Sequence, residues 1–488
     1  MSVDLTKTNI EVKEYQLLLE DLQGNILQGY EQDYAVQIFL KFESDAQATR
    51  QWIRDFAAEF VTSAQHQLNE PQKYSQDSSQ NFPKLWANFF LSAHGYQALG
   101  FELKGKRLQF PSWTFLAGMK AFKPILSDPP IDQWQDGFRG DIDALILLAA
   151  DQSEYLQQQA KTVMKAVSHV ACIVNTEVGH ILRNAQIQPN GKGQTIEHFG
   201  FRDGISQPLF FKQDIEQRQQ QGNDQWDACA PLELVLVKDP FGQGENSYGS
   251  YCVYRKLKQD VQGFRQREKQ LVQKLGLTGN DAERAGALVI GRFRDGTPIT
   301  LSNSGQGDTT IVNNFNYADD TEGTKCPFHA HIRKTNPRGD RGDSVESLEE
   351  QRQHRIVRRA IPYGGTSPEQ QTLTSAISRL REHLTSLPHE ALRVENNEGV
   401  GLLFLCFQRD IFNQFMFMQK SWVNQKNFVK YDTGLDPVAG QGKQLDGGQK
   451  WSKEWGQEEK VSFEFNNFVR MQGGEFFFAP SISFLANI

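Results

Sequence analysis

Alternating apolar and polar residues near the start of the chain predict a strand followed by a helix. In YAVQIFLKFES (34–44), one face carries Val36, Ile38, Leu40 and Phe42. Ser44 and Asp45 can then cap a helix, because Trp52, Phe56 and Phe60 recur every four residues beyond them. The pattern therefore predicts a half-buried strand and an amphipathic helix.

The remainder of the first half continues this alternation of elements. Apolar runs predict strands in LWANFFLS (85–92), DALILLAA (143–150) and VACIVNTEVGHI (170–181). The segment DQSEYLQQQAKTVMKAVSH (151–169) has the periodicity of a helix, and an insertion rich in Trp and Pro separates the two middle strands. The predicted order is β-α-β-β-α-β.

The second half repeats this order. Strands are predicted in GSYCVYRKLKQ (249–259), RIVRRAIPYG (355–364), VGLLFLCFQ (400–408) and GGEFFFAPSISFL (473–485), and helices in DVQGFRQREKQLVQKLG (260–276) and DIFNQFMFMQKSW (410–422). Two βαββαβ units predict an α+β fold made of two ferredoxin-like domains with antiparallel sheets. The duplication is one of architecture, not of sequence.

Polar segments place the predicted boundaries and insertions. The Gln-rich stretch QDIEQRQQQGNDQWD (213–227) resembles a linker or long surface loop, and it divides the chain into domains 1–225 and 226–488. Residues 68–80 and 439–460 are long and polar without periodicity, so we expect surface insertions there.

Composition narrows the class of protein. The chain has 488 residues, of which 38% are hydrophobic, a net charge of −7 and five scattered cysteines. These values favour a globular protein and argue against a general nucleic-acid binder. With no run of about 18 apolar residues and no apolar leader, we expect a cytoplasmic protein that does not cross a membrane. No C-x-x-C or C-x-x-C-H spacing occurs, which excludes a thiolate zinc cluster and covalent c-type haem.

The densest cationic stretch is CPFHAHIRKTNPR (326–338). Its two histidines, His329 and His331, lie two positions apart, and Arg338 follows a proline that fixes the chain. A guanidinium presented in this way suits a carboxylate or a phosphate. Spacing alone favours a solvated basic loop.

Two other segments carry charged residues that could act in catalysis or stabilise the fold. In HRIVRRAIPYG (354–364), Arg358 and Arg359 stand among apolar residues, so a buried arginine there needs an anion or another hydrogen-bonding partner. Asp410 follows a buried strand, where it can cap the next helix or orient an imidazole, and capping is the commoner role.

The tetrad Phe-Arg-Asp-Gly occurs twice, at 201–204 and at 293–296. In the first copy, Asp203 stands between Gly200 and Gly204, which lets the backbone lie close to a flat ligand. The second copy has Arg292 in place of Gly200, and its Asp295 belongs to an ordinary hairpin sequence. We expect chemistry from Asp203 and a turn from Asp295.

Together, DLQGNILQGY (21–30), EHFGFRDGISQP (197–208), CPFHAHIRKTNPR, RIVRRAIPYG and GLLFLCFQRDIFNQF (401–415) resemble the dye-decolourising peroxidases, in that family's order and most like its longer members. The resemblance runs from about residue 20 to the C-terminus. It implies non-covalent haem b in a pocket of the C-terminal domain. The G-x-x-D-G motif would come from the N-terminal domain.

The resemblance also implies residue roles. His331 matches the proximal haem ligand and metal-binding residue, with His329 as the alternative. Asp203 matches the distal acid/base aspartate and Arg358 the distal arginine, with Arg359 left open by the register. Asp410 resembles the carboxylate that accepts a hydrogen bond from the ligating imidazole, and Arg338 resembles an anchor for a haem propionate.

These roles imply a haem peroxidase that reduces hydrogen peroxide through a ferryl intermediate and oxidises dyes and phenolic or other aromatic reductants. Asp203 would move the proton and Arg358 would stabilise the departing oxygen. Because an ordinary aspartate titrates near about 3.9, activity toward dyes is expected to be highest below neutral pH. Surface Trp or Tyr residues could pass electrons from bulky reductants; Trp451 and Trp455 are candidates, although such aromatics more often pack locally.

Two other functions compete with the peroxidase. A haem-binding or haem-handling protein would need His331 and Arg338 but not the pair Asp203 and Arg358. A phosphate-binding hydrolase would use the arginines but lacks a P-loop or a set of metal ligands. A homo-oligomer is compatible with the long loops.

Overall fold

The computed structural model describes residues 3–43, 45–70, 83–103, 110, 112–184, 193–220, 222, 224–307, 312–340, 342, 346–365, 367–385, 399–466 and 468–488. The largest sheet contains the strands β1 (Tyr34–Phe42), β2 (Trp86–Leu91), β3 (Ala144–Ala150), β4 (Ala171–His180), β7 (Val237–Lys238), β8 (Tyr248–Gln259), β9 (Val357–Arg358), β10 (Ile361–Tyr363), β11 (Val400–Gln408) and β14 (Val469–Ala479). Two smaller sheets pair β5 (Leu182–Asn184) with β6 (Gln194–Ile196) and β12 (Gln449–Ser452) with β13 (Lys460–Phe463).

The large sheet closes on itself. Its order is β7-β8-β14-β2-β3-β1-β4-β10-β11-β9, and β8 also pairs with β11, so that the strands from β8 to β11 form a ring. The N-terminal strands run in the order β2-β3-β1-β4 and the C-terminal ones in the order β14-β8-β11-β10. Both orders are those of a ferredoxin-like unit, and every pairing in the sheet is antiparallel. The predicted α+β fold with two ferredoxin-like units is confirmed, and the two sheets join as one barrel.

The interior of the barrel holds a core that both units share. The ring of Phe39 on β1 lies 4.8 Å from that of Tyr254 on β8, and the ring of Phe90 on β2 lies 6.1 Å from that of Phe407 on β11. All four side chains are fully buried. The barrel is therefore filled with side chains and is not a channel. The predicted division at residues 225 and 226 stays a prediction.

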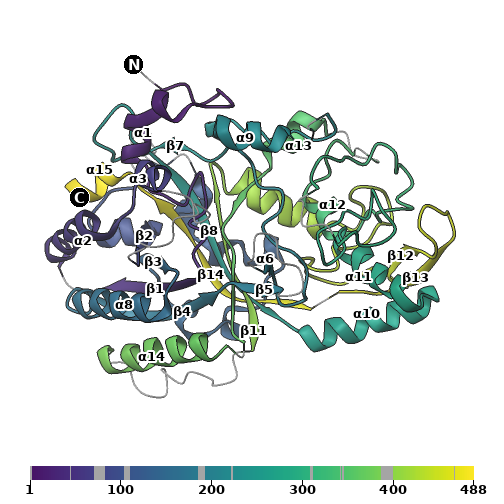
Figure 1. Ribbon diagram of the computed structural model, residues 1–488. Coiled ribbons are helices and arrows are strands. Elements are labelled where there is room, and N and C mark those ends of the chain that lie inside the picture. The colour runs from purple at the N-terminus through teal and green to yellow at the C-terminus, as the bar shows by residue number, and fades with distance from the viewer. Residues whose placement is uncertain are drawn as a thin grey trace.

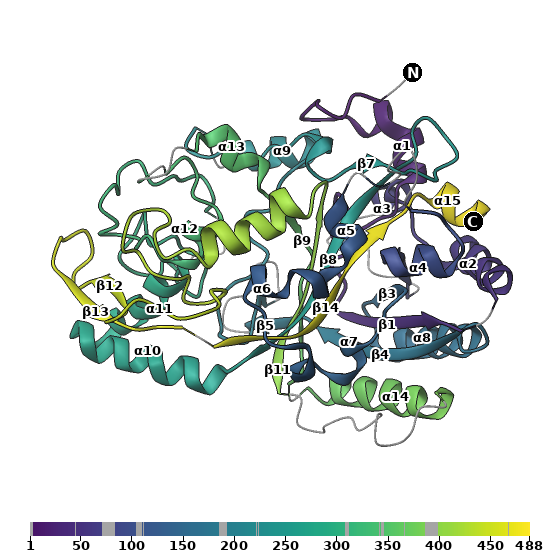
Figure 2. The same cartoon turned by 180° about the vertical axis from the view of Figure 1, so that it is seen from behind.

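Helices cover the outside of the N-terminal strands. Asp45 caps α2 (Ala46–Phe60) as predicted, because its carboxylate accepts hydrogen bonds from the N–H groups of Gln47 and Ala48. Helices α8 (Ser153–Val167) and α14 (Pro368–Leu384) pack together along β4, while α15 (Ile482–Asn487) packs on α2 (Figure 1). The Trp- and Pro-rich insertion forms α5 (Trp113–Ala117), η2 (Met119–Phe122), α6 (Lys123–Leu126), η3 (Ile131–Gln133) and α7 (Asp136–Arg139), of which η2 and α7 lie against β14 (Figure 2).

A second lobe extends from the C-terminal strands on the side away from α2 and α8. It contains α10 (Val261–Leu275), η6 (Gly279–Ala282), α11 (Glu283–Ile290), α12 (His331–Thr335) and the hairpin of β12 and β13 (Figures 1 and 2). Its core is separate from that of the barrel, and it centres on Phe264, Trp451 and Phe465. Most of the candidate catalytic residues lie in the long loops of this lobe or where it meets the barrel.

The remaining helices are short: η1 (Val12–Tyr15), α1 (Gln16–Asp21), α3 (Ala64–Asn69), α4 (Ala93–Ala98), α9 (Lys212–Gln219), η5 (Leu232–Leu234) and α13 (Leu348–Gln353). The helix predicted at 410–422 forms two π-helical segments, η7 (Phe412–Met416) and η8 (Met418–Val423). The segment 213–227, expected to be a linker or long surface loop, is helical in its first part, where α9 lies. The insertion expected at 68–80 lies largely outside the described residues, and the one at 439–460 contains β12.

Candidate active site

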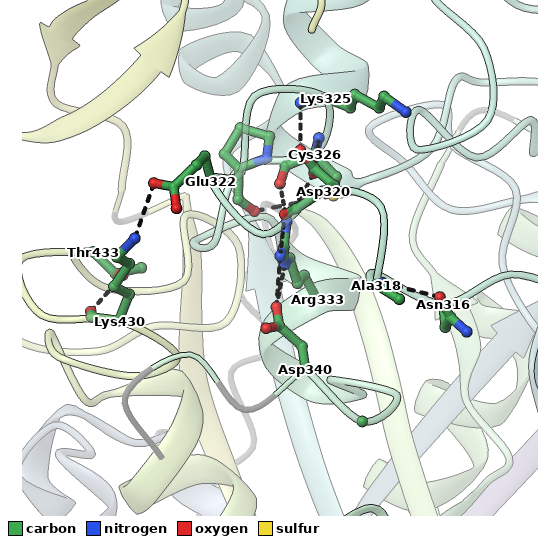
Figure 3. Close-up of polar contacts among 12 residues, drawn as sticks. Asn316, Ala318, Asp320, Glu322, Lys325, Cys326, Arg333, Asp340, Lys430 and Thr433 are labelled. Atoms are coloured by element: carbon green, nitrogen blue, oxygen red, sulfur yellow. Dashed lines mark hydrogen bonds and ion pairs between the residues drawn. The ribbon is translucent and has the colours of Figure 1, made fainter. Parts of the chain in front are cut away.

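Helix α12 begins at His331 and is held by a buried arginine. Arg333 on this helix is fully buried and forms ion pairs with Asp320 at 2.9 Å and with Asp340 at 2.6 Å. Figure 3 shows the guanidinium between these two carboxylates. Asp320 also accepts hydrogen bonds from the backbone N–H groups of Lys325 and Cys326. These contacts fix the short helix from one side and so fix the position of His331.

His331 has a buried carboxylate as its partner. Its Nδ1 lies 2.8 Å from Oδ2 of Asp436, and that carboxylate is fully buried. Burial alone would favour the neutral imidazole, but the charge and the hydrogen bond of Asp436 outweigh it and raise the pKa of His331. Among the described residues, Nε2 has no hydrogen-bond partner. A proton held on Nδ1 thus leaves the Nε2 lone pair available to a metal.

Asp436 itself is held as an anion. Its Oδ1 accepts hydrogen bonds from the backbone N–H groups of Val438 at 2.7 Å and Ala439 at 3.0 Å. Burial favours the neutral acid, yet His331 and these N–H groups together lower the pKa of Asp436. Asp436 can therefore stay ionised while its carboxylate accepts the hydrogen bond from Nδ1–H of His331.

The structure corrects the predicted role of Asp410, which does not contact His331. Its Oδ1 accepts hydrogen bonds from the backbone N–H groups of Phe412 at 2.9 Å and Asn413 at 3.1 Å, at the start of η7. The commoner role of a carboxylate after a strand, capping a helix, is the one it has. Asp436 takes the place beside the imidazole.

The alternative histidine, His329, lies in a different environment. It is buried, and its ring meets that of Trp451 edge-on at 4.3 Å. Burial lowers the pKa of His329 well below its ordinary value, and its Nε2 is buried with no hydrogen-bond partner among the described residues. No carboxylate in the described part of the chain orients this imidazole, so the contacts of His331 make it the better candidate for the ligand.

The first tetrad lies in a loop that a half-buried glutamate holds together. The carboxylate of Glu197 accepts hydrogen bonds from the backbone N–H groups of Phe199 and Phe201 and from the side chain of Gln259. Gly200 between them has φ of +94°, a conformation that favours glycine. Burial raises the pKa of Glu197 to about 6, although its three hydrogen bonds act against this. Glu197 therefore shapes the loop that carries Asp203.

Asp203 and Arg358 lie next to each other in the site. Oδ1 of Asp203 lies 3.8 Å from Nη1 of Arg358, and the two side chains are 31% and 33% exposed. Arg358 also donates to the carbonyl of Ile205 at 3.0 Å, which ties it to the same loop. The charges of Arg358 and Asp203 both act on the pKa of His331. The structure therefore places Asp203 and Arg358 close enough to His331 for their charges to affect its pKa.

Arg359, the other arginine left open by the sequence, is a structural anchor. Its guanidinium donates to the backbone carbonyls of Asn25 at 2.7 Å, Ile26 at 3.2 Å and Arg358 at 2.8 Å. Burial lowers the pKa of Arg359 to about 9. This contact explains the opening motif DLQGNILQGY, which supplies two of the three carbonyls.

Arg338 has contacts that do not favour the predicted role as a propionate anchor. Its Nη1 donates to the carbonyls of Asn313 and Phe315, and its Nη2 donates to the side chains of Asn313 and Ser206. These four bonds use the hydrogens of both Nη atoms inside the protein. Through Ser206, Arg338 connects the segment after α12 to the loop that carries Asp203, hereafter the distal loop.

The second tetrad forms the expected hairpin turn. The carboxylate of Asp295 accepts hydrogen bonds from the N–H groups of Thr297 and Gly307, and Gly296 has φ of +94°. The turn packs on the first tetrad: a Cβ placed on Gly296 would lie 3.0 Å from Cδ of Arg202. The two copies are therefore neighbours in space, and only the first contributes a carboxylate to the site.

The two candidate tryptophans pack locally. Trp451 is fully buried and donates its indole N–H to the carbonyl of Phe463 at 2.8 Å. Trp455 donates to the carbonyl of Ile299 at 2.7 Å, and Lys325 lies over its ring. Neither side chain is free on the surface.

Three residues of the site escaped the sequence reasoning: Asp436, Glu197 and Arg202. Arg202 has a buried Nη1 with no hydrogen-bond partner among the described residues, and it directly precedes Asp203. A buried guanidinium nitrogen without an acceptor indicates that an anionic group belongs beside it. A haem carries carboxylates, and the free Nε2 of His331 suits its iron, so the residues fit this cofactor.

Comparison with known proteins identifies relatives of this chain. The family model described as the DyP dimeric alpha+beta barrel domain matches residues 21–182. The multifunctional dye peroxidase DyP2 of Amycolatopsis sp. is 37% identical over 503 residues, covering 100% of both chains. A dye-decolorizing peroxidase of Mycetinis scorodonius, msp1, is 29% identical and covers 97% of this chain and 88% of its own length.

Solved structures give the same result over the whole chain. The crystal structure of a DyP-type peroxidase from Anabaena sp. is 43% identical, with a TM-score of 0.85 over 99% of this chain and 98% of that one. DyP2 from Amycolatopsis sp. superposes with a TM-score of 0.86 over 100% of both chains at 36% identity.

A barrel of two ferredoxin-like units with a carboxylate-bonded histidine and a nearby acid–arginine pair is compatible with a haem peroxidase. The chain belongs to the family of dye-decolourising peroxidases, whose members oxidise dyes with haem as cofactor. This membership excludes the phosphate-binding hydrolase. In the described part of the chain, no helix combines the length and the apolar character that crossing a membrane requires.

Proposed function

We propose that this peroxidase binds haem b without covalent attachment, through Nε2 of His331, and uses it to reduce hydrogen peroxide and oxidise aromatic reductants. All five cysteines are free thiols. The relative complexed with 2,6-dimethoxyphenol, 27% identical with a TM-score of 0.70, supports phenols as one class of reductant. Bound haem supplies the iron at which the O–O bond is cleaved and the oxidising equivalents that the reductants consume.

His331 and Asp436 form the proximal half of the site. The hydrogen bond from Nδ1 to the buried carboxylate fixes the tautomer and the orientation of the ring, and it gives the imidazole anionic character. A more basic ligand favours oxidation chemistry over oxygen storage. Asp436 thus takes the role first assigned to Asp410.

Asp203 and Arg358 form the distal half. The carboxylate of Asp203 accepts a proton from one peroxide oxygen and returns it to the other oxygen, which leaves as water. Arg358 stabilises the negative charge that develops on the departing oxygen. The observation that carries this proposal is the 3.8 Å contact between the two side chains, whose charges both act on His331.

Arg202 is our candidate for a cation that holds a haem carboxylate, in place of Arg338. Burial lowers the pKa of Arg202, and the charge of Asp295 only partly offsets this. Such a guanidinium is stabilised when an anion binds beside it. Arg338 is instead assigned to the connection between the segment after α12 and the distal loop.

The test is rapid mixing of haem-loaded Asp203→Asn and Arg358→Leu variants with hydrogen peroxide. We expect the first absorbance change to slow by about 10²- to 10⁴-fold for Asp203→Asn and about 10²- to 10³-fold for Arg358→Leu. Equal haem content and melting temperature are required of all the proteins compared. Unchanged rates in both variants would show that the distal assignment is wrong.

The haem-handling alternative predicts a different result. A protein that only carries haem has no need of an acid and a cation on the distal face, so both substitutions would leave its peroxide reaction unchanged. An acidic pH optimum toward dyes follows from an aspartate as the proton acceptor, and a rate profile that peaks above neutrality would count against Asp203. A cytoplasmic location and a homo-oligomeric state stay predictions.

A further inference from the structure

Lys334 is a buried lysine three residues beyond His331 on the short helix α12. Its side chain has no exposed surface. Its Nζ donates hydrogen bonds to two backbone carbonyls, that of Gln425 at 2.7 Å and that of Gly434 at 2.6 Å. No carboxylate among the described residues contacts it. Burying this amine costs free energy, which its two hydrogen bonds and the nearby charge of Asp436 offset in part.

The two carbonyls belong to the loop that carries Asp436. Gln425 and Gly434 stand at the two ends of a loop whose ends are already close, because the N–H of Gly434 donates to the carbonyl of Lys426 at 2.8 Å. Asp436 follows Gly434 by two residues, and its own N–H donates to the carbonyl of Val423 at 3.1 Å. Lys334 thus joins both ends of this loop, hereafter the 425–434 loop, to the helix of the ligand.

Helix α12 therefore contacts one region of the chain twice. His331 and Lys334 are three residues apart, a spacing that places side chains on one face of a helix. His331 contacts Asp436 directly, and Lys334 contacts the backbone leading to it. Arg333 between them turns to the opposite side, toward Asp320 and Asp340. The distance between Nδ1 and the carboxylate is thereby fixed by a second link between the same two segments.

We propose that Lys334 is a positioning residue for the ligating imidazole: by holding the carbonyls of Gln425 and Gly434, it keeps Asp436 within hydrogen-bonding distance of Nδ1 of His331. The proposal rests on the proposed function only where it concerns haem. Burial lowers the pKa of Lys334 to about 7, and both the ammonium and the neutral amine have the two N–H groups that these contacts need.

The first test uses the full chain without haem. In protein labelled with ¹⁵N-histidine, the Nδ1–H proton of His331 is expected to resonate far downfield, because it is hydrogen-bonded to a buried carboxylate. The resonance is assigned by its absence in His331→Ala. Lys334→Met, which has a similar length and no donor, is expected to lose this resonance or to reduce it several-fold. Lys430→Met is the control, since Lys430 lies in the same loop and pairs at the surface with Glu322. It is expected to keep the wild-type resonance.

The second test uses the haem-loaded proteins. In Lys334→Met the dissociation constant for haem is expected to rise by about 10-fold, as for loss of a residue that orients a ligand. The iron–histidine stretching frequency of the ferrous protein is expected to shift toward that of Asp436→Asn. Should Lys334→Met not fold, Lys334→Gln replaces it, because its amide has N–H donors on a stem too short to reach both carbonyls.

The outcomes separate the two proposals. A wild-type His331 resonance and stretching frequency in the folded Lys334 variants overturns the positioning role. If His331→Ala retains haem while the Lys334 variants lose the resonance, His331 is not the ligand, yet Lys334 still positions the hydrogen bond. Loss of the resonance, weaker haem binding and an unaffected Lys430→Met together support both.

Discussion

The proposed proximal and distal sides of this site differ in how far water can reach the polar groups that support them. On the proximal side, Asp436 and Lys334 are fully buried. On the distal side, Asp203 and Arg358 are 31% and 33% exposed, and they meet at 3.8 Å, beyond the length of a hydrogen bond. The groups that hold the imidazole are thus buried and hydrogen-bonded, although the imidazole itself is 25% exposed, whereas Asp203 and Arg358 are partly exposed and loosely paired.

This difference matches what each side has to do. An imidazole that holds iron needs one tautomer and one orientation, and buried hydrogen bonds provide both because no water competes for them. An acid/base group has to meet a small substrate and exchange protons, so it needs access and some freedom to move. The comparison predicts that changes on the proximal side alter cofactor binding, whereas changes on the distal side alter reaction rate.

The largest expected effect is loss of the cofactor in His331→Ala. If His331 is the ligand, as proposed, removing the imidazole removes the nitrogen that binds iron, so we expect no stoichiometric haem and no peroxidase activity above that of free haem. Absorption in the Soret region during titration with haemin measures this. His329→Ala is the matched control, and it should retain haem; the opposite pattern would exchange the roles of the two histidines.

Asp436→Asn should weaken haem binding without abolishing it. Replacing the carboxylate that orients a ligand typically costs about 10- to 100-fold in affinity. Competition for haem with apomyoglobin gives the dissociation constants. Asp410→Asn removes the carboxylate that sequence analysis placed in this role, and it should leave the affinity within about 2-fold; an equal loss in both variants would contradict the assignment of Asp436.

Glu197 makes the stability of the distal loop depend on pH. Burial raises the pKa of Glu197 to about 6 in the folded chain, from 4.5 in the absence of such effects. The folded state therefore holds this proton more tightly, and the stabilisation present below pH 4.5 is lost as the pH rises through about 6. The linked change in the free energy of unfolding is about 2 kcal/mol.

This dependence can be isolated by substitution. The difference in unfolding free energy between Glu197→Gln and wild type, followed by chemical denaturation from pH 4.5 to 7, should change by that amount. Glu459→Gln, at an exposed position, should show no such change. A constant difference for Glu197→Gln would mean that Glu197 titrates alike in the folded and unfolded chains.

The smallest expected effect is that of Asp410→Ala. Loss of the capping carboxylate at the start of η7 should lower the free energy of unfolding by about 1 kcal/mol. The melting temperature should fall by a few degrees, with haem content and activity unchanged. A marked loss of activity would give Asp410 a role beyond capping.

Much of the fold could be read from the sequence because each strand has its own pattern. The runs at 34–44, 143–150 and 400–408 coincide with β1, β3 and β11 to within a few residues. Closure of the barrel could not be predicted, since an alternating pattern of apolar residues shows which face of a strand is buried but not which strand lies beside it. The contacts that link the two halves are brief: β4 meets β10 at Gly179 and Tyr363, and β14 meets β2 at Phe478 and Leu91.

The candidate site was predictable where its residues stand in dense motifs. His331, Asp203 and Arg358 each lie in such a motif. Asp436 does not: it follows His331 by 105 residues in the irregular loop TGLDPVAG. A weak signal was present, because an aspartate before proline favours a turn in which its carboxylate accepts backbone N–H groups. Asp410 had the more regular context, which reflects the helix cap it forms.

The doubled tetrad gives the most direct test of the central claim, that the distal side carries the proton transfer. Haem-loaded Asp203→Asn and Asp295→Asn change the same residue in the same four-residue sequence, in two loops that pack together. Stopped-flow measurement of the second-order rate constant with hydrogen peroxide at pH 5 should show a fall of about 10²- to 10⁴-fold for Asp203→Asn and a value within about 2-fold of wild type for Asp295→Asn. Equal rate constants in the two variants would contradict the account.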